Sequence, residues 1–262
     1  MLQEFDLSGR VAIVTGGGTG IGKATAMLLA KRGADIAIAG RKADVLDAAA
    51  KDIAAATGRK CVAIPTDVRQ PDQCKALMDK TADKLGKIDI LINNAGGAHG
   101  HIGLSKMDLS KWDRDIQLNL SSAQYCAQAA IPYLKETGGS IVNVSSLAGM
   151  HGSLGVGAYS AAKAGLQMLT RVMAAEWGPA GVRVNCVAPG MTGTEKAQEN
   201  WEKGVYDPME ASKAFPLRRP GTMEEVAQMI VFFASPAASY ITGETIAVGG
   251  GPQIAGLTTV ED

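Results

Sequence analysis

The chain alternates short apolar runs with longer helical patterns from one end to the other. Seven runs rich in Val, Ile and Ala predict strands, at residues 11–15, 35–39, 61–65, 87–92, 140–144, 182–188 and 245–248. The stretches between them carry helix signals, at residues 23–32, 43–57, 71–85, 110–135, 158–177 and 222–234. Strands that alternate with helices form βαβ units, which assemble into a parallel sheet covered by helices on both faces.

This alternation predicts an α/β fold, a doubly wound parallel sheet of Rossmann-like type with about seven strands. No linker, composition shift or internal repeat divides the sequence, so we expect a single domain over residues 1–262. The polar, mixed segment at about 191–220 is expected to form a lid over the substrate. Ligands of such sheets bind beyond the carboxyl ends of the strands, so residues that directly follow strands are the candidates for function.

The first predicted strand runs through a glycine-rich turn into a helix. Gly16, Gly20 and Gly22 have G-x-x-x-G-x-G spacing, which differs from the usual G-x-G-x-x-G because that register places Ile21 at its last position. A helix N-terminus offers free N–H groups, and glycine lets a pyrophosphate approach the backbone closely. The turn therefore predicts a dinucleotide site, with a glycine-rich turn that binds no ligand as the alternative.

A tyrosine and a lysine occur four residues apart at the start of the helix predicted at 158–177. This spacing places the phenol of Tyr159 and the ammonium of Lys163 on one helix face. A nearby cation favours the phenolate, which makes Tyr159 a candidate general acid/base for a carbonyl/alcohol pair. A surface tyrosine beside a solvated lysine is the commoner explanation of such a pair taken alone.

Two further polar residues, Ser146 and Asn119, are candidates for the functional site because of their positions in the predicted elements. Ser146 follows the fifth predicted strand, and its hydroxyl can donate to a substrate oxygen, although Ser145 competes for that role and a serine can simply end a strand. Asn119 lies among apolar neighbours within a predicted helix, where asparagine is unfavourable. Holding a water molecule or bending the helix would explain Asn119, and so would a satisfied structural asparagine.

In combination, these motifs resemble the short-chain dehydrogenase/reductase family over about residues 8–251. The resemblance rests on Thr15-Gly-x-x-x-Gly-x-Gly22, Asn93-Asn-Ala-Gly96, Asn119, Ser146, Tyr159-x-x-x-Lys163 and Pro189-Gly190, in this order. It implies a nicotinamide cofactor along the strand ends and hydride transfer between a ketone and a secondary alcohol. A 3-oxoacyl thioester reductase is one form of this chemistry.

The resemblance also implies a role for each matching residue. Tyr159 would be the proton donor, and Lys163 would bind the nicotinamide ribose and lower the pKa of Tyr159. Ser146 would hold the substrate carbonyl, and Asn119 would anchor a water molecule that completes a proton relay. Gly16, Gly20 and Ile21 would line the pyrophosphate, Asp67 and Val68 would meet the adenine, and Asn93, Ala95 and Gly96 would lie on the adenosine ribose side. Pro189, Thr192 and Thr194 would orient the carboxamide. The other implied cofactor-binding residues are Gly18, Thr19, Tyr159, Lys163 and Gly190.

The residues after the second predicted strand favour NADP(H) over NAD(H) as the cofactor. An acidic residue here would accept the ribose hydroxyls and repel a 2′-phosphate, but the position holds Gly40, followed by Arg41 and Lys42. A guanidinium suits a phosphate, whereas a solvated basic turn is the alternative. Thr19 stands where many NADP-using relatives carry a basic residue in the glycine turn, so Arg41 would supply most of the preference.

Composition narrows the classes of partner. Lys plus Arg and Asp plus Glu both number 26, so no basic excess indicates a nucleic acid or a membrane as the partner. Four separated cysteines make neither a disulfide framework nor a metal site, and no secretory signal is visible at the start, so a reducing cytoplasm is expected. We expect a small carbonyl or alcohol substrate and no metal. The resemblance also implies a homotetramer that pairs helices 110–135 and 158–177 across subunits. Core packing explains the apolar content of those helices equally well.

Several alternatives remain open at this stage. The glycine turn and Arg41-Lys42 are also similar to 2,4-dienoyl-CoA reductases, and NAD-dependent alcohol or sugar dehydrogenases belong to the same family. The alternative that is not an enzyme is a nucleotide-binding scaffold without catalytic activity. The substrate contacts are equally open: His99 and His101 are candidates in the loop after Asn93-Asn-Ala-Gly96, and Trp201, Tyr206 and Met209 are candidates in the lid.

Overall fold

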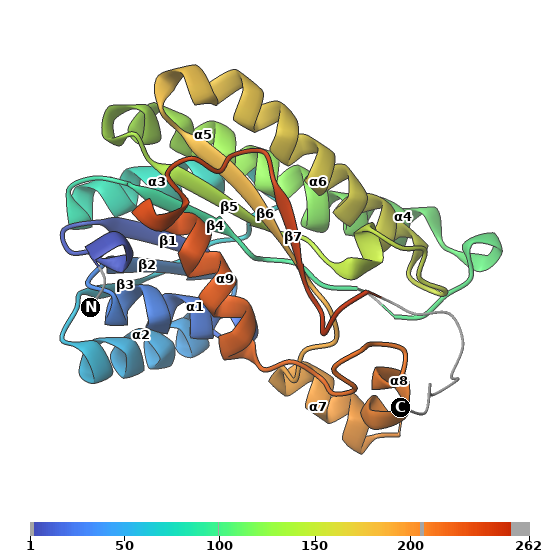
Figure 1. Cartoon of the computed structure of the whole chain (residues 1–262). Helices are drawn as coiled ribbons and strands as arrows, with labels where there is room; N and C mark the ends of the chain where they lie inside the picture. Colours follow the sequence, from blue (N-terminus) through green and yellow to red (C-terminus); the bar gives the residue numbers. More distant parts are fainter. Residues whose placement is uncertain (1–2, 99, 205–206, 253–262) are drawn as a thin grey trace.

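Seven parallel strands form one sheet in the order β3-β2-β1-β4-β5-β6-β7 (Figure 1). The computed structural model describes residues 3–98, 100–204 and 207–252. The strands are β1 (Val11–Thr15), β2 (Asp35–Gly40), β3 (Cys61–Pro65), β4 (Ile90–Asn93), β5 (Ser140–Val144), β6 (Arg183–Pro189) and β7 (Thr245–Val248). The predicted doubly wound α/β fold and its seven strands are confirmed.

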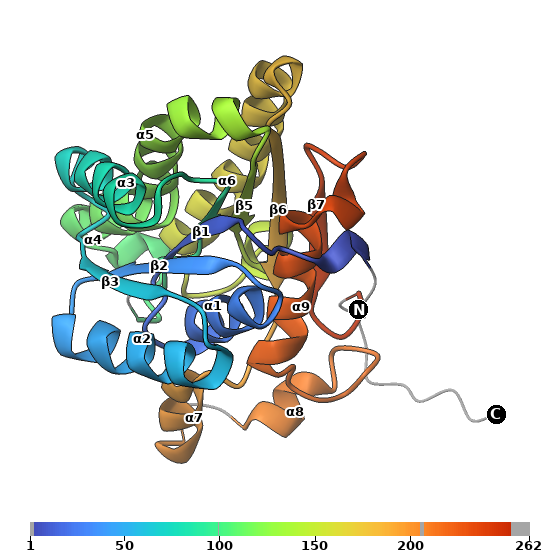
Figure 2. The ribbon, with the colours of Figure 1, turned by 90° about the vertical axis from the view of Figure 1, so that its left-hand side faces the viewer.

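Helices cover both faces of the sheet (Figure 2). One face carries α1 (Gly20–Lys31), α2 (Ala43–Thr57) and α9 (Met223–Ala234), and the other carries α3 (Pro71–Leu85), α5 (Ser122–Thr137) and α6 (Gly157–Trp177). The remaining elements are α4 (Leu109–Ile116), a π turn η3 (Gln117–Ser121), α7 (Glu195–Glu202), α8 (Pro208–Ser212) and the short turns η1 (Gln3–Phe5), η2 (Leu104–Lys106), η4 (Leu147–Gly149), η5 (Gly178–Ala180) and η6 (Pro236–Ala238). No helix among the described residues is long and apolar enough to cross a membrane.

The helix boundaries follow from local capping chemistry. Gly58 and Gly138 end α2 and α5 in the left-handed region, at φ +69° and +59°, where a side chain would be strained. Thr222 begins α9 with the capping box expected from the sequence: its hydroxyl accepts from the Glu225 N–H, and the Glu225 carboxylate accepts from the Thr222 N–H. The two glycines end their helices directly before β3 and β5, so the chain can return to the sheet as the next strand.

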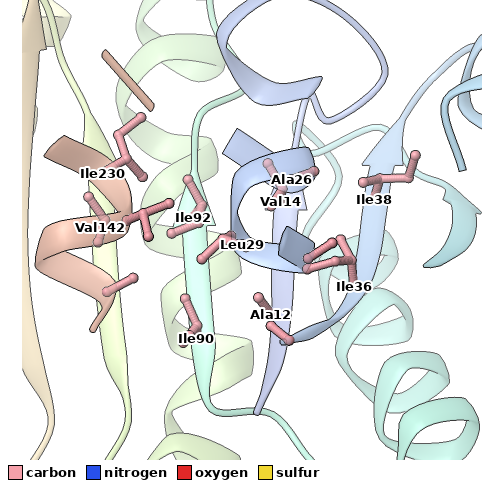
Figure 3. Close-up of a cluster of buried hydrophobic side chains, with 14 of the residues drawn as sticks. Ala12, Val14, Ala26, Leu29, Ile36, Ile38, Ile90, Ile92, Val142 and Ile230 are labelled. Atoms are coloured by element: carbon pink, nitrogen blue, oxygen red, sulfur yellow. The ribbon is translucent and has the colours of Figure 1, made fainter. Parts of the chain in front are cut away.

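The sheet core has two apolar layers, one on each face. In one layer Ala12, Val14, Ile36, Ile38, Ile90, Ile92 and Val142 pack against Ala26 and Leu29 of α1 and Ile230 of α9 (Figure 3). Their neighbours along the strands, such as Ile13 and Leu91, face the opposite layer with α3 and α5. Because both faces are covered, the strands are apolar throughout rather than alternating, which is why short apolar runs identified them.

Two predicted elements differ in detail from the sequence interpretation. The strand expected at 87–92 is β4 (Ile90–Asn93), although the backbone of Asp89 before it still bonds to Val11 and Ser140 of the neighbouring strands. The long helix expected at 110–135 consists of α4 and α5 joined by the π turn η3. The segment 191–220, which is expected to form a lid, contains two short helices, α7 and α8, that extend from one side of the sheet (Figure 1).

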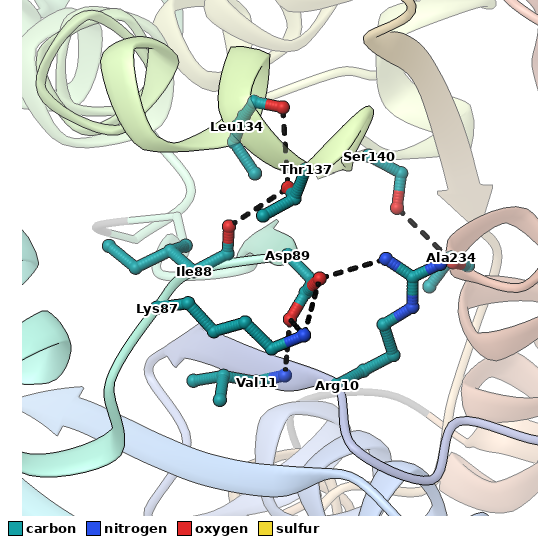
Figure 4. A network of polar contacts seen from close by, with 9 residues as sticks. All are labelled: Arg10, Val11, Lys87, Ile88, Asp89, Leu134, Thr137, Ser140 and Ala234. Carbon is teal, nitrogen blue, oxygen red and sulfur yellow. Dashed lines mark hydrogen bonds and ion pairs between the residues drawn. The ribbon is translucent and has the colours of Figure 1, made fainter.

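A buried carboxylate joins the amino-terminal ends of β1 and β4 (Figure 4). The Asp89 side chain is 1% exposed and accepts hydrogen bonds from Arg10 Nη1 and from the Val11 N–H, each at 2.8 Å. Lys87 Nζ lies 3.2 Å from Asp89 Oδ2, which is the oxygen that also accepts from the Val11 N–H. A buried charge with this many partners is stable only while they remain.

We expect Asp89→Ala to lower the free energy of unfolding by about 2 kcal/mol, because the Val11 N–H loses its acceptor while the half-exposed Arg10 and Lys87 return to water. Urea unfolding at pH 7 measures the change. Glu210→Ala is the control, since it breaks an exposed pair with Lys213 and is expected to shift stability by less than about 0.5 kcal/mol. Equal effects of the two substitutions would contradict the role given to Asp89.

Candidate active site

A cleft of about 760 Å³ crosses the carboxyl ends of the strands, where the strand order reverses between β1 and β4. It is lined by most of the residues expected from the sequence, namely Gly16, Gly18, Thr19, Gly20, Ile21, Arg41, Lys42, Asp67, Val68, Ala95, Gly96, Ser146, Tyr159, Lys163, Pro189, Gly190, Thr192 and Thr194. Asn93 and Asn119 lie behind this lining. A smaller cavity of about 580 Å³ lies at the opposite edge, around Asp89 and Arg183, and contains none of the expected residues.

The glycine turn leaves no room for side chains at its closest approaches. A Cβ on Gly22 would meet the carbonyl of Gly16 and the amide of Asn94, and one on Gly16 would lie 2.9 Å from the same amide. Gly16 and Gly20 also have φ of +65° and +56°. The N-cap Thr19 makes no side-chain hydrogen bond, and the first turn of α1 has no acidic residue, so α1 does not satisfy its own N-terminal N–H groups.

Thr15 and Asn94 connect the end of β1 to the loop that follows β4. Thr15 Oγ1 accepts from the N–H groups of Asn94 and Ala95, both at 3.0 Å, and donates to the Ile92 carbonyl. The Asn94 side chain donates to the Thr15 carbonyl at 2.9 Å. Asn94 lines the cleft and was not among the individual site residues expected from the sequence.

The Asn93 side chain does not line the cleft and bonds within the protein, while the expected contact of this segment with the adenosine ribose stays a prediction. Its Nδ2 donates to Asn143 Oδ1 at 2.9 Å and to the Ala123 carbonyl at 3.2 Å, and Asn143 in turn donates to Thr170. These bonds link β4, β5 and α6 within the protein. The Asn93 side chain thereby positions the strand ends, and only its backbone faces the loop that follows.

The geometry distinguishes the two serines after β5. Ser145 Oγ donates to the Lys163 carbonyl at 2.8 Å and accepts from Gln167 Nε2 at 3.0 Å, so its hydroxyl is used within the protein. Ser146 Oγ accepts from the Ala148 N–H at 3.1 Å, which leaves its proton for a partner in the cleft. Of the two, Ser146 is the serine able to donate to a ligand.

Tyr159 and Lys163 lie together on the first turns of α6. Lys163 is 3% exposed, its Nζ donates to the Val144 carbonyl at 2.8 Å and lies 5.7 Å from the centre of the Tyr159 ring. Burial lowers the pKa of Lys163 to about 8. Burial raises the pKa of Tyr159, and a hydrogen bond with Ser146 opposes that rise.

The raised pKa of Tyr159 reflects its burial, and the expected role of Lys163 in lowering that pKa stays a prediction. The ammonium lies over the ring and bonds to the strand carbonyl, so in this structure Ser146 is the group that lowers the Tyr159 pKa against the effect of burial. A raised pKa keeps the phenol protonated at neutral pH. The arrangement therefore suits Tyr159 as a proton donor.

Asn119 lies in the π turn η3 and is 1% exposed. Its side chain forms a reciprocal pair with Gly97, accepting from the N–H at 2.8 Å and donating to the carbonyl at 3.0 Å, and also donates to the Asp115 carbonyl. A Cβ on Gly96 would lie 2.7 Å from Asn119 Oδ1 and 3.0 Å from Lys163 Nζ. Asn119 thus fixes the loop after β4 to η3, and π turns of this kind are frequent at functional sites.

The other end of the cleft is basic. Arg69 binds the Asp67 carboxylate through Nε at 2.9 Å and through Nη2 at 2.5 Å, which lowers the pKa of Asp67, and Arg41 lowers it further. Arg41 and Lys42 line the cleft beside this pair. Arg69 was missed by the sequence interpretation, although the Asp67-x-Arg69 spacing was visible. Because Arg69 neutralises Asp67, the charge left at this end is positive.

The lid and the loop after β4 contribute less to the cleft. Thr192, Thr194, Glu195, Lys196 and Glu199 of the lid line it, whereas Met209 is exposed and His101 lies in a loop that a bridge between Ile102 and Val156 joins to the segment before α6. Trp201 packs beside Gly193, and a Cβ added to Gly193 would lie 3.6 Å from the Trp201 ring. His99 and Tyr206 lie outside the described residues. Within residues 3–98, 100–204 and 207–252, no group of three or more His, Cys, Asp or Glu side chains could hold a metal ion.

The residues present fit a dinucleotide with its nicotinamide at α6. The glycine turn supplies backbone N–H groups without Cβ atoms, the basic end supplies Arg41 and Lys42, and the absence of a Cβ at Gly96 keeps that loop close to Lys163. Tyr159 and Ser146 then offer a proton donor and a hydroxyl in the same cleft. Such a set can bind a carbonyl oxygen and protonate it.

Known proteins share this sequence and arrangement. Residues 16–253 match a family model described as enoyl-(acyl carrier protein) reductase. The chain is 41% identical to a cis-4-hydroxycyclohexanecarboxylate dehydrogenase of Sinomonas cyclohexanicum, over 92% of this chain and 96% of the relative. It is 39% identical to a 3-oxoacyl-[acyl-carrier-protein] reductase of Thermotoga maritima, over 94% and 98%. A short-chain type dehydrogenase/reductase structure from Mycobacterium ulcerans superimposes with a TM-score of 0.89 at 33% identity, over 94% of this chain and 90% of that one.

Proposed function

Because the chain belongs to the short-chain dehydrogenase/reductase family of oxidoreductases, we propose that it interconverts a ketone and a secondary alcohol with NADP(H) as cofactor. The observation that carries this proposal is the placement of Ser146, Tyr159 and Lys163 on one cleft wall, with the glycine turn and Arg41 farther along the same cleft. Asn119 holds the loop after β4 against this wall.

In the direction of reduction, Tyr159 acts as the general acid. The bound nicotinamide supplies the hydride, and the chain supplies the proton and the position of the carbonyl. Ser146, whose hydroxyl hydrogen-bonds with Tyr159 in this structure, would donate a hydrogen bond to the substrate oxygen, where negative charge develops, and would keep its own proton. Tyr159 then donates the phenol proton to that oxygen, and its raised pKa ensures that the proton is present at pH 7.

Lys163 acts on Tyr159 and on the cofactor ribose. With a pKa of about 8 it carries its charge at neutral pH, and the bond to the Val144 carbonyl holds the ammonium beside the ring. That charge stabilises the phenolate left after proton transfer. In the direction of alcohol oxidation, the same charge would favour the phenolate form of Tyr159, which is the form that can accept the proton of the alcohol.

The basic end of the cleft supports NADP(H) as the cofactor. Gly40 replaces the acidic side chain that would repel a 2′-phosphate, and Arg69 neutralises Asp67, the acidic residue that lines this end. Arg41 and Lys42 are then available for the phosphate.

We expect Arg41→Ala to raise the Kd of NADPH about tenfold or more, because a charge-assisted hydrogen bond to a phosphate is lost, and to change the Kd of NADH by less than about twofold. Titration followed by the fluorescence of the reduced cofactor measures both constants. Arg59→Ala is the matched control, since Arg59 pairs with Asp35 away from the cleft. Unchanged discrimination between the two cofactors in Arg41→Ala would overturn the assignment.

A screen of carbonyl compounds tests the proposed reaction. Loss of NADPH absorbance with a ketone, including 3-oxoacyl thioesters and cyclic ketones, supports ketone reduction. Turnover with an enoyl or dienoyl thioester alone would instead favour reduction of a carbon–carbon double bond, the activity named in the description of the matching family model. Tight binding of NADPH without turnover on any member of either class would favour a nucleotide-binding scaffold.

We further propose a single-domain protein with a lid at about 191–220 that works in the cytoplasm as a homotetramer without nucleic acid, membrane or metal partners. Support for the assembly comes from α6, where Met168 and Val172 are 56% and 45% exposed on a helix that otherwise packs on the sheet. Exposed apolar side chains on one helix face are typical of subunit contacts. The small carbonyl or alcohol substrate would enter beside the lid.

A further inference from the structure

A lid carboxylate occupies the N-terminus of α1. Glu195, the first residue of α7, accepts a hydrogen bond from the Gly20 N–H through Oε2 at 3.0 Å. Gly20 is the first residue of α1, and a Cβ on it would lie 3.6 Å from the Thr194 methyl and 3.7 Å from Glu195 Oε2. The lid therefore lies directly against the glycine turn.

The contact satisfies a need of the glycine turn itself. Thr19 provides no side-chain cap, and α1 has no acidic residue in its first turn. A carboxylate at a helix N-terminus accepts from the free N–H groups and is stabilised by their partial positive charge. Glu195 thus supplies from the lid the anion that α1 lacks in its own sequence.

The start of α7 fixes where this carboxylate is held. Thr194 is the N-cap of α7, and its hydroxyl accepts from the Ala197 N–H at 3.2 Å, so Glu195 leaves the backbone at a defined helical position. Thr192 and Gly221 also form a bridge that ties the base of the lid to the segment before α9. The base of the lid is thereby anchored by these contacts, and the Glu195 side chain itself is exposed.

We propose that Glu195 is an internal competitor for the pyrophosphate of the cofactor. The inference rests on the proposed function, in which the glycine turn binds that pyrophosphate through the same N–H groups. Two anions cannot share the Gly20 N–H, and their charges repel each other at this distance. Cofactor binding therefore exchanges the Glu195 carboxylate for the pyrophosphate, and the return of Glu195 promotes cofactor release.

Direct binding measurements on the full chain test the exchange. We expect Glu195→Ala to lower the Kd of NADPH about three- to tenfold and to slow NADPH dissociation by a similar factor, because the competing anion is gone. Glu195→Gln keeps a neutral acceptor and is expected to have a smaller effect. Glu202→Ala, an exposed acidic residue at the other end of α7, is the matched control and should leave the Kd within about twofold.

A ligand without a pyrophosphate separates competition from a general change in charge. Adenosine 2′-monophosphate reaches only the basic end, so Glu195→Ala should leave its Kd unchanged while that of NADPH falls. An unchanged or weaker affinity of Glu195→Ala for NADPH, or equal tightening for both ligands, would overturn the proposal. Failure of the wild-type chain to bind NADPH and NADH would instead overturn the proposed function.

Discussion

Replacement of Tyr159 by phenylalanine is expected to lower kcat/KM about 10³-fold, within the range for loss of a positioned general acid. The substitution removes only the phenol oxygen from a largely buried ring, so packing and the fold should persist. Ser146 loses its hydrogen-bonding partner but keeps the bond from the Ala148 N–H. Steady-state kinetics with the substrate found in the screen measures the loss, and the Kd of NADPH should change by less than about twofold.

A matched tyrosine provides the control for this result. Tyr133 on α5 donates to Asp79 at 2.9 Å and lies outside the cleft, so Tyr133→Phe should keep kcat/KM within about twofold. Near-normal turnover of Tyr159→Phe would show that another group delivers the proton. Equal losses in both variants would point to a general effect of removing a hydroxyl rather than to catalysis.

The sequence predicted the fold because each strand carries its own local signal. Runs such as 35–39 and 61–65 are apolar on both faces, and glycines such as Gly58 and Gly138 mark the helix ends, so strand number and order of elements follow from patterns a few residues long. The buried ion pair before β4 depends on a contact that is distant in the sequence. Asp89 is held by Arg10, which is distant in sequence, and no local pattern contains that contact.

The candidate site shows the same division between local and distant information. The spacing of Tyr159 and Lys163 was readable because both lie on one helix. The choice between Ser145 and Ser146 was not, because it depends on α6, whose Lys163 carbonyl and Gln167 side chain bind the first serine. The sequence also does not predict the contact of Glu195, since its partner Gly20 lies 175 residues away in the chain.

The direction of the Tyr159 pKa shift links the fold to the chemistry. The spacing in the sequence predicts that Lys163 favours the phenolate of Tyr159, and this stays a prediction. Helix α6 places the ammonium over the ring and against the Val144 carbonyl. Burial then dominates and favours the neutral phenol. Tyr159 is thereby protonated and able to donate its proton at neutral pH. The nearby Lys163 ammonium would stabilise the phenolate that forms after this donation.

Lys163→Met is expected to lower kcat/KM about 10²- to 10³-fold and at the same time to stabilise the fold at pH 7. The unfolded lysine has a pKa of 10.5, and burial lowers it to about 8 in the folded protein. Below pH 8 both states carry the proton, and the buried ammonium then costs about 3 kcal/mol of stability. Methionine removes that cost but leaves the Val144 carbonyl without its donor, so we expect a net gain of about 1–2 kcal/mol.

The pH dependence of this gain separates the charge of Lys163 from its packing. Between pH 8 and 10.5 the unfolded chain binds more protons than the folded one, so wild-type stability contributed by this group rises with pH through that window. The advantage of Lys163→Met over wild type should therefore shrink from pH 7 to pH 10 in urea unfolding. Lys80→Met, at an exposed position on α3, should show no such change. A variant that is inactive but no more stable at pH 7 than at pH 10, relative to wild type, would show that the Lys163 ammonium imposes no cost on folding.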